Sequence, residues 1–167
     1  MESSEQARFE AVVLPHLDAA YTLARYLTRN AHDAEDVVQD ACLRALKYFE
    51  TFRGGEGTSA RAWLLTIVRN TAYSSRRGQR DATEFDETQH SDAVAEEHPE
   101  AALLQTDARE ALGRALDRLA PEFREVIVLR ELEGLSYKEI GDVTGVPVGT
   151  VMSRLSRARA RLQEALT

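Results

Sequence analysis

The sequence LSYKEIGDVTGVPVGTVMSRLSRARARL, residues 135–162, decides the fold because it has the pattern of a helix-turn-helix. Ser136 and Glu139 have the spacing of a capping box, which starts a short helix. Gly145 can adopt the left-handed conformation that ends this helix. Pro147 then leads into a second helix, since proline is favoured in the first helical turn. The stretch therefore predicts two short helices joined by a tight turn.

The second of these helices has two different faces. Apolar side chains recur at helical spacing on one face: Val151, Leu155, Ala158 and Leu162. Hydroxyl and guanidinium groups occupy the other face: Thr150, Ser153, Arg154, Arg157 and Arg161. A helix that packs on one side and presents donors on the other is suited to the major groove of DNA. The alternative is a helical hairpin with a solvated basic face, which the agreement of cap, glycine and faces disfavours.

The composition of the 167 residues excludes several classes of protein. Cys42 is the only cysteine, so neither an internal disulfide nor a cysteine-rich metal site is possible. The four histidines show no ligand spacing, and we expect no metal and no cofactor. No apolar run is long enough to span a membrane and the N-terminus lacks a signal peptide, so we expect no membrane insertion and a cytoplasmic protein. No nucleophile–base pair or phosphate-binding loop supports an enzyme.

The net charge of −7 comes from one segment. Residues 1–80 contain 11 basic and 10 acidic side chains, and residues 109–167 contain 10 and 9. Residues 81–108 contain nine acids and no lysine or arginine, and they lack helical periodicity over 81–99. We therefore predict an all-α protein, in which two small helical domains, 1–80 and 108–167, are joined by an acidic flexible linker, 81–107.

Helical periodicity predicts the elements on both sides of this linker. One amphipathic helix is expected over 9–27, a second that Asp33 caps, and a third over 59–77. After the linker a helix is expected from residue 108, and another begins at Pro121 and ends at Gly134.

A glycine-rich loop before the third helix is a second candidate for nucleic-acid binding. Arg53, Gly54, Gly55 and Arg61 have the chemistry to hold a phosphate or an unstacked base. Side chains that can stack on bases or neutralise a backbone follow on the helix: Trp63, Arg69, Tyr73, Arg76 and Arg77. Periodicity alone favours a core position for Trp63, and the arginines alone are compatible with a solvated helix end.

Four blocks occur in a fixed order: DAEDVVQDACLRALKYF (33–49), FRGGEGTSARAWLLTIVRN (52–70), LAPEFREVIVLRELEGLSYKEIG (119–141) and VPVGTVMSRLSRARARL (146–162). Together they closely resemble bacterial RNA polymerase sigma factors of the extracytoplasmic-function (ECF) class of the sigma-70 superfamily. The resemblance covers residues 8–80 and 100–165. It implies a factor that binds the polymerase core, recognises the −10 and −35 promoter elements and directs transcription initiation.

The resemblance also implies roles for individual residues. Asp36, Gln39 and Asp40 match the motif that binds the clamp helices of the largest core subunit. The loop 53–59 matches the one that captures a flipped −10 base. Residues near the melted strand and its upstream duplex are Arg61, Trp63, Arg69 and Asn70. The helix-turn-helix matches the −35 reader, whose domain also binds the flap of the second-largest subunit.

Such factors are commonly controlled by an anti-sigma protein in an environmental or stress response, so we expect that partner too. Two positions depart from the family pattern. Met152 replaces the usual basic residue, and Ser74 replaces the usual acid. The alternative function is a dimeric helix-turn-helix regulator that acts on DNA without core polymerase.

Overall fold

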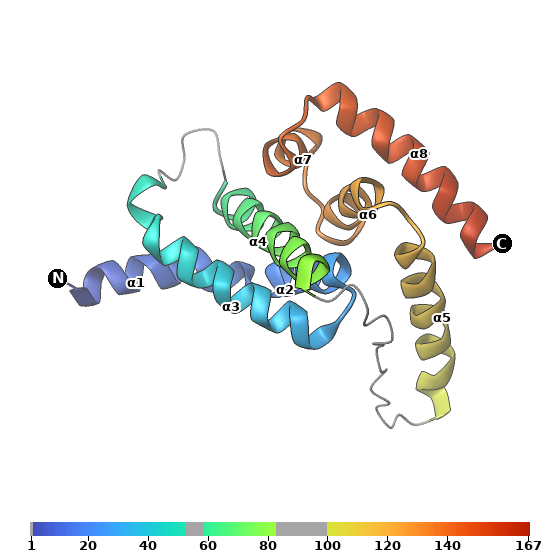
Figure 1. The fold of residues 1–167 in the computed structure, drawn as a ribbon, viewed down its shortest axis with the longest axis horizontal. Helices are drawn as coiled ribbons and strands as arrows, with labels where there is room; N and C mark the ends of the chain where they lie inside the picture. Colours follow the sequence, from blue (N-terminus) through green and yellow to red (C-terminus); the bar gives the residue numbers. More distant parts are fainter. Residues whose placement is uncertain (1, 53–58, 83–99) are drawn as a thin grey trace.

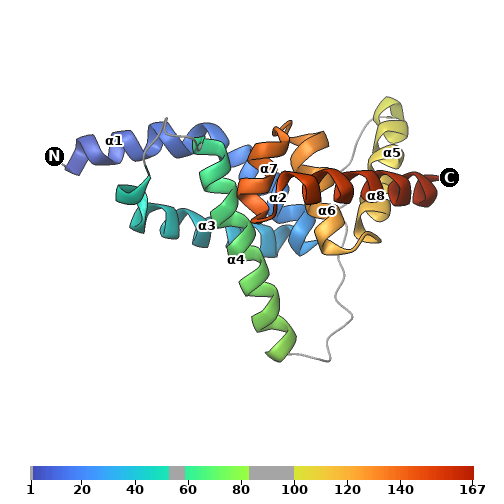
Figure 2. The same cartoon turned by 90° about the horizontal axis from the view of Figure 1, so that it is seen from above.

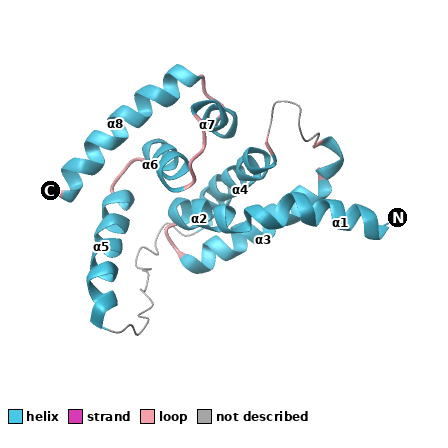
Figure 3. Ribbon diagram, turned by 180° about the vertical axis from the view of Figure 1, so that it is seen from behind, coloured by secondary structure: helices cyan, strands magenta, loops and turns pink. Residues whose placement is uncertain are grey.

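The structure, a computed structural model, describes residues 2–52, 59–82 and 100–167, with side chains in 4–52, 59–75 and 107–167. Every regular element in these ranges is helical, which confirms the all-α prediction (Figure 3). The order is α1 (Glu2–Val13), η1 (Leu14–His16), α2 (Leu17–Thr28), α3 (Ala31–Lys47), η2 (Phe49–Thr51), α4 (Ala60–Ala82), α5 (Glu100–Asp117), α6 (Pro121–Ile127), η3 (Val128–Leu132), α7 (Tyr137–Thr144) and α8 (Val148–Leu166).

The single helix expected over 9–27 is wrong, because the chain forms α1 and α2 with a 3-10 turn between them. Pro15 lies in this turn, where its missing N–H and its ring interrupt the helical hydrogen bonds. The apolar residues of α2 still face inward: Ala19, Ala20, Leu23, Ala24 and Leu27 are buried.

The cap expected at Asp33 is also wrong, since α3 begins three residues earlier, at Ala31. Asn30 is the N-cap, and its side-chain oxygen accepts a hydrogen bond from the Asp33 N–H at 2.9 Å. In α4, the Ser59 hydroxyl accepts from the Ala62 N–H at 3.0 Å, so a cap again fixes the start of the helix. The helices α2, α3 and α4 pack against one another as the first helical group.

The second helical group consists of α5 to α8. Helix α5 begins at Glu100, so helical structure starts earlier than the expected residue 108. Pro121 is in the first turn of α6, as predicted, and Gly134 ends the following π-helical turn with a φ of 69°. Arg124 is buried and donates to the carbonyls of Leu116 at 2.9 Å and Leu119 at 2.7 Å, which satisfies the C-terminal end of α5.

The two groups share one continuous hydrophobic core in the described residues. Helix α4 packs against α7, and α2 packs against α6 (Figure 1). Figure 2, seen from above, shows α7 beside α4 and α8 extending away over α6. In this structure the two helical groups therefore contact each other directly.

Candidate nucleic-acid interface

The helix-turn-helix forms as the sequence predicts. The Ser136 N–H donates to the Glu139 carboxylate at 2.9 Å, and the Glu139 N–H donates to the Ser136 hydroxyl at 3.1 Å. Gly145 ends α7 with a φ of 76°, in the left-handed region. At Gly141 a Cβ atom would lie 2.9 Å from the carbonyl oxygen of Val146, so the close packing of this turn requires glycine.

Helix α8 presents the two faces that its sequence indicates. Val151, Leu155 and Ala158 are buried, and Leu162 is half-buried. The side chains expected at DNA are half-buried or exposed: Thr150 and Arg154 are half-buried, and Ser153, Arg157 and Arg161 are exposed. Met152 lies among them with 52% of its surface exposed. The structure therefore brings the predicted −35 residues together on one accessible side of the helix.

Helix α3 carries the three residues expected at the polymerase clamp. Asp36, Gln39 and Asp40 are all exposed on one side of the helix. Leu43 continues this side by one turn and is 65% exposed, although neighbouring apolar residues of α3 are buried. Sequence reasoning missed Leu43, and its spacing of three and seven residues from Asp40 and Asp36 was the available signal.

Trp63 belongs to an aromatic cluster on the first helical group. Its ring centroid lies 4.8 Å from that of Phe52 and 6.3 Å from that of Phe49. It is half-buried, so it both packs against the core and retains an exposed edge. Asn70 is exposed on α4.

The remaining residues expected at the −10 strand lie outside what the structure describes. Arg53, Gly54 and Gly55 fall in the undescribed range 53–58. Arg76 and Arg77 lie within α4, but their side chains are not among those described.

Arg69 faces the second helical group, where its guanidinium makes a bidentate ion pair with Glu125 of α6 at 2.6 and 3.1 Å. The Tyr73 hydroxyl donates to the same carboxylate at 3.1 Å, and the Arg69 guanidinium stacks on the Tyr73 ring at 4.8 Å. Burial acts to lower the pKa of Arg69, but the hydrogen bonds that its guanidinium donates to Glu125 and the negative charge of that carboxylate together outweigh burial, so the pKa is raised. Burial beside this carboxylate also raises the pKa of Tyr73, which keeps the hydroxyl protonated as a donor.

Arg61 makes a second set of contacts across the same boundary. Its guanidinium lies 3.6 Å from the Glu139 carboxylate of α7 and donates to the Glu133 carbonyl at 3.0 Å. The Ser59 hydroxyl donates to Glu139 at 2.9 Å. Although burial acts in the opposite direction, hydrogen bonds from Ser136 and Ser59 and the charge of Arg61 lower the pKa of Glu139.

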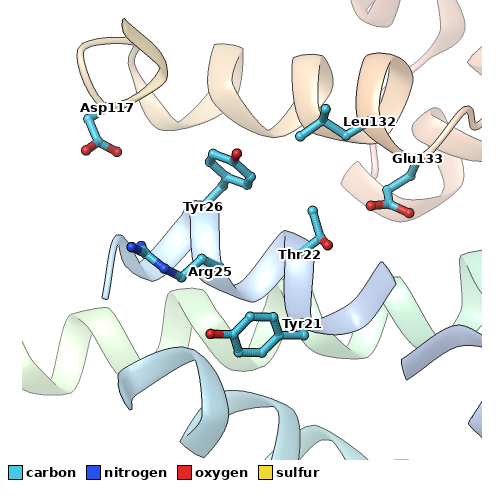
Figure 4. Close-up of a pocket in the computed structure, with 7 residues that line it drawn as sticks. All are labelled: Tyr21, Thr22, Arg25, Tyr26, Asp117, Leu132 and Glu133. Carbon is cyan, nitrogen blue, oxygen red and sulfur yellow. The ribbon is translucent and has the colours of Figure 1, made fainter. Parts of the chain in front are cut away.

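A pocket of about 470 Å³ separates other parts of the two groups (Figure 4). Its lining consists of Tyr21, Thr22, Arg25 and Tyr26 from α2 and of Asp117, Leu132 and Glu133 from the second group. Burial raises the pKa of Glu133 at its edge. The two groups therefore share a hydrophobic core and also enclose an open pocket between α2 and the second group.

Metal sites and membrane spans are both absent from the described residues. Among the side chains that the structure describes, no three histidine, cysteine or acidic residues converge as metal ligands do. None of the described helices is both long and apolar enough for a membrane span.

Comparison with known proteins identifies the family. The family described as Sigma-70 region 2 matches residues 12–82, and Sigma-70 region 4 matches residues 109–162. The ECF RNA polymerase sigma factor SigE of Mycolicibacterium smegmatis is 37% identical over 95% of this chain, which spans 61% of SigE. The ECF RNA polymerase sigma-E factor of Escherichia coli K12 is 34% identical over 95% of this chain and 86% of its own length.

A solved structure agrees with these relatives. The sigma factor RpoE, crystallised with the anti-sigma factor NepR from Bartonella quintana, has 33% identity and a TM-score of 0.79. The similarity covers 95% of this chain and 96% of RpoE. The chain therefore belongs to the sigma-70 family of RNA polymerase sigma factors, in its extracytoplasmic-function class.

Proposed function

We propose that this chain binds the RNA polymerase core in the cytoplasm and directs it to promoters with separated −10 and −35 elements. The observation that carries this proposal is that one chain holds both an acidic clamp-type face on α3 and a helix-turn-helix with an accessible polar face. The chain supplies no catalytic group of its own, because the polymerase performs the chemistry.

The exposed face of α3 and the polar face of α8 assign different roles to the two parts of the chain. Residues 1–80 act as the core-binding and −10 domain, with Asp36, Gln39 and Asp40 at the clamp helices. Residues 108–167 act as the −35 domain and bind the flap, and residues 81–107 connect them. Helix α8 holds duplex DNA and sets the register through Ser153, Arg154 and Arg157.

Recognition of the −10 element requires melting of the duplex, and each unstacked base costs a few kcal/mol. Capture of a flipped base by loop 53–59 and contacts from Arg61, Trp63, Arg69 and Asn70 offset part of this cost. Arg76 and Arg77 neutralise the DNA backbone at the −10 element.

Run-off transcription with purified core polymerase tests the proposal. Genomic fragments serve as templates, and the addition of this chain is expected to produce defined start sites with two shared upstream elements. Core polymerase alone is the control. A chain that binds promoter DNA tightly by itself and adds no initiation would instead be the dimeric regulator.

We also propose that an anti-sigma protein holds the chain inactive, in a response to an environmental signal. The support is the similarity over nearly the whole chain to RpoE, which was solved in complex with the anti-sigma factor NepR. Affinity purification of the chain from its native cell extract is expected to recover a partner that competes with core polymerase. A recovered partner that leaves core binding unchanged would contradict this part of the proposal.

A further inference from the structure

The contacts between the two helical groups use side chains that promoter binding also needs. Arg69 and Arg61 are proposed to face the −10 region, yet in this structure both are bound to acids of the second group. The Glu125 side chain is only 1% exposed, and that of Arg69 is 22% exposed. A guanidinium that donates two hydrogen bonds to a buried carboxylate cannot offer the same donors to a phosphate.

The buried position of Glu125 makes this pair dependent on the arrangement of the groups. A carboxylate buried without a partner is strongly unfavourable, so Glu125 requires Arg69 and Tyr73 while the two helical groups are in contact. When the groups separate, water can solvate Glu125, and Arg69 becomes available. The closed arrangement and the DNA-bound arrangement therefore compete for one side chain.

A second acid, Glu139, makes similar contacts near the start of α4. Glu139 accepts hydrogen bonds from Ser59 of the first group and lies beside Arg61, while it also caps its own helix, α7. Helix α7 packs directly on α4 here, so the start of the proposed −10 helix is covered by the proposed −35 domain.

We propose that Ser59, Arg61, Arg69 and Tyr73 form a clasp with Glu125 and Glu139 that holds the free chain in an autoinhibited, closed conformation. The clasp opens when the chain binds core polymerase, and the −10 side chains are then released to DNA. The closed conformation is a property of the chain alone, and only the meaning of its opening depends on the proposed function.

The distance between the two groups in the free full-length chain tests the clasp. Cys42 is replaced by serine, and spin labels are placed at Ala31 and Ala160, which are exposed on α3 and α8. Pulsed electron spin resonance is expected to give one short distance for the otherwise unaltered chain. The pair Glu125→Gln and Glu139→Gln is expected to raise the ratio of open to closed molecules roughly tenfold, seen as a longer and broader distance distribution.

Glu131→Gln is the control, because it removes one carboxylate of the second group that pairs within that group and not with the first. Glu131 pairs with Arg159 at 2.8 Å within the second group, so its loss is expected to leave the distance unchanged. Glu139→Gln alone guards against misfolding, since glutamine can also complete a capping box. Circular dichroism verifies that each variant is folded.

Core binding provides the second readout. An equilibrium that favours the closed state lowers the apparent affinity of the chain for core polymerase. The chain that carries both Glu125→Gln and Glu139→Gln is therefore expected to bind core polymerase up to tenfold more tightly than the parent chain. A parent chain with a long distance, or a folded Glu139→Gln variant with parental distance and affinity, would overturn the clasp. A parent chain that is closed but never binds core polymerase would instead contradict the proposed function.

Discussion

Single residues on α8 determine how the proposed −35 element is read. Each bidentate contact between an arginine and a guanine contributes about 1–3 kcal/mol of discrimination. Arg154→Ala and Arg157→Ala are therefore each expected to reduce transcription roughly tenfold from a promoter with an intact −35 element, as measured by run-off assays. Arg159→Ala is the control, because the Arg159 guanidinium is bound to Glu131. Equal effects of all three substitutions would contradict the assigned face.

His16 gives the chain a pH dependence of known sign. Burial lowers the pKa of His16, and the nearby charge of Arg61 lowers it further. The unfolded chain therefore takes up this proton first as the pH falls below the ordinary value of 6.5. We expect the free energy of unfolding, measured by urea titration, to decrease from pH 7.5 toward pH 6, and His16→Gln to reduce this slope. An unchanged slope in the variant would assign the effect to other groups.

Among elements, the tight turn of the helix-turn-helix depends on the absence of a side chain at Gly141. Gly141→Ala places a methyl group against the Val146 carbonyl, which is backbone and cannot move aside easily. A loss of about 1–3 kcal/mol in the free energy of unfolding is expected. Gly149→Ala is the matched control, because nothing lies within 4 Å of its Cβ, and it is expected to stabilise α8 by up to about 1 kcal/mol. Thermal denaturation of both variants measures the contrast.

The exposed side of α3 is the second element with a separable role. Leu43 is 65% exposed, so Leu43→Asp is expected to leave the melting temperature nearly unchanged. Because Leu43 continues the face of Asp36, Gln39 and Asp40, the same substitution is expected to weaken core polymerase binding about tenfold. Leu166→Asp, at a residue that is 50% exposed at the end of α8, is the control. Binding competition with labelled parent chain distinguishes the two.

Elements with local signals could be predicted, and those without could not. The capping box of α7 and the left-handed Gly145 follow from neighbouring residues, and both are confirmed. Asn30 and Asp33 are equally good N-cap residues, so sequence alone could not select Asn30. Pro15 was a local signal that the apolar spacing on either side of it obscured. The pairing of Arg69 with Glu125 joins positions 56 residues apart, and no periodicity reports such a contact.

On the scale of the whole molecule, the two helical groups share a hydrophobic core and are also joined by polar contacts between α4 and the second group. The shared core and the ion pairs predict that the groups stay associated without a covalent connection. A protease site inserted within 83–99 is expected to yield, after cleavage, two fragments that co-elute in size-exclusion chromatography at low salt. The same cleavage of the Glu125→Gln and Glu139→Gln chain is expected to give separate fragments. Separation of the parent fragments would contradict this prediction, because it would show that the contacts between the two groups do not keep them associated.

The ion pair between Arg69 and Glu125 also has a genetic consequence. Substitutions of Arg69 remove a proposed DNA contact and also destabilise the closed conformation. Their phenotypes therefore combine a loss of DNA binding with a gain in the fraction of open molecules. Substitutions of Glu125 change only the closed form. In a selection on a reporter gene, dominant hyperactive alleles should therefore gather at acids of α6 and α7, while recessive inactive alleles gather on α3, α4 and α8.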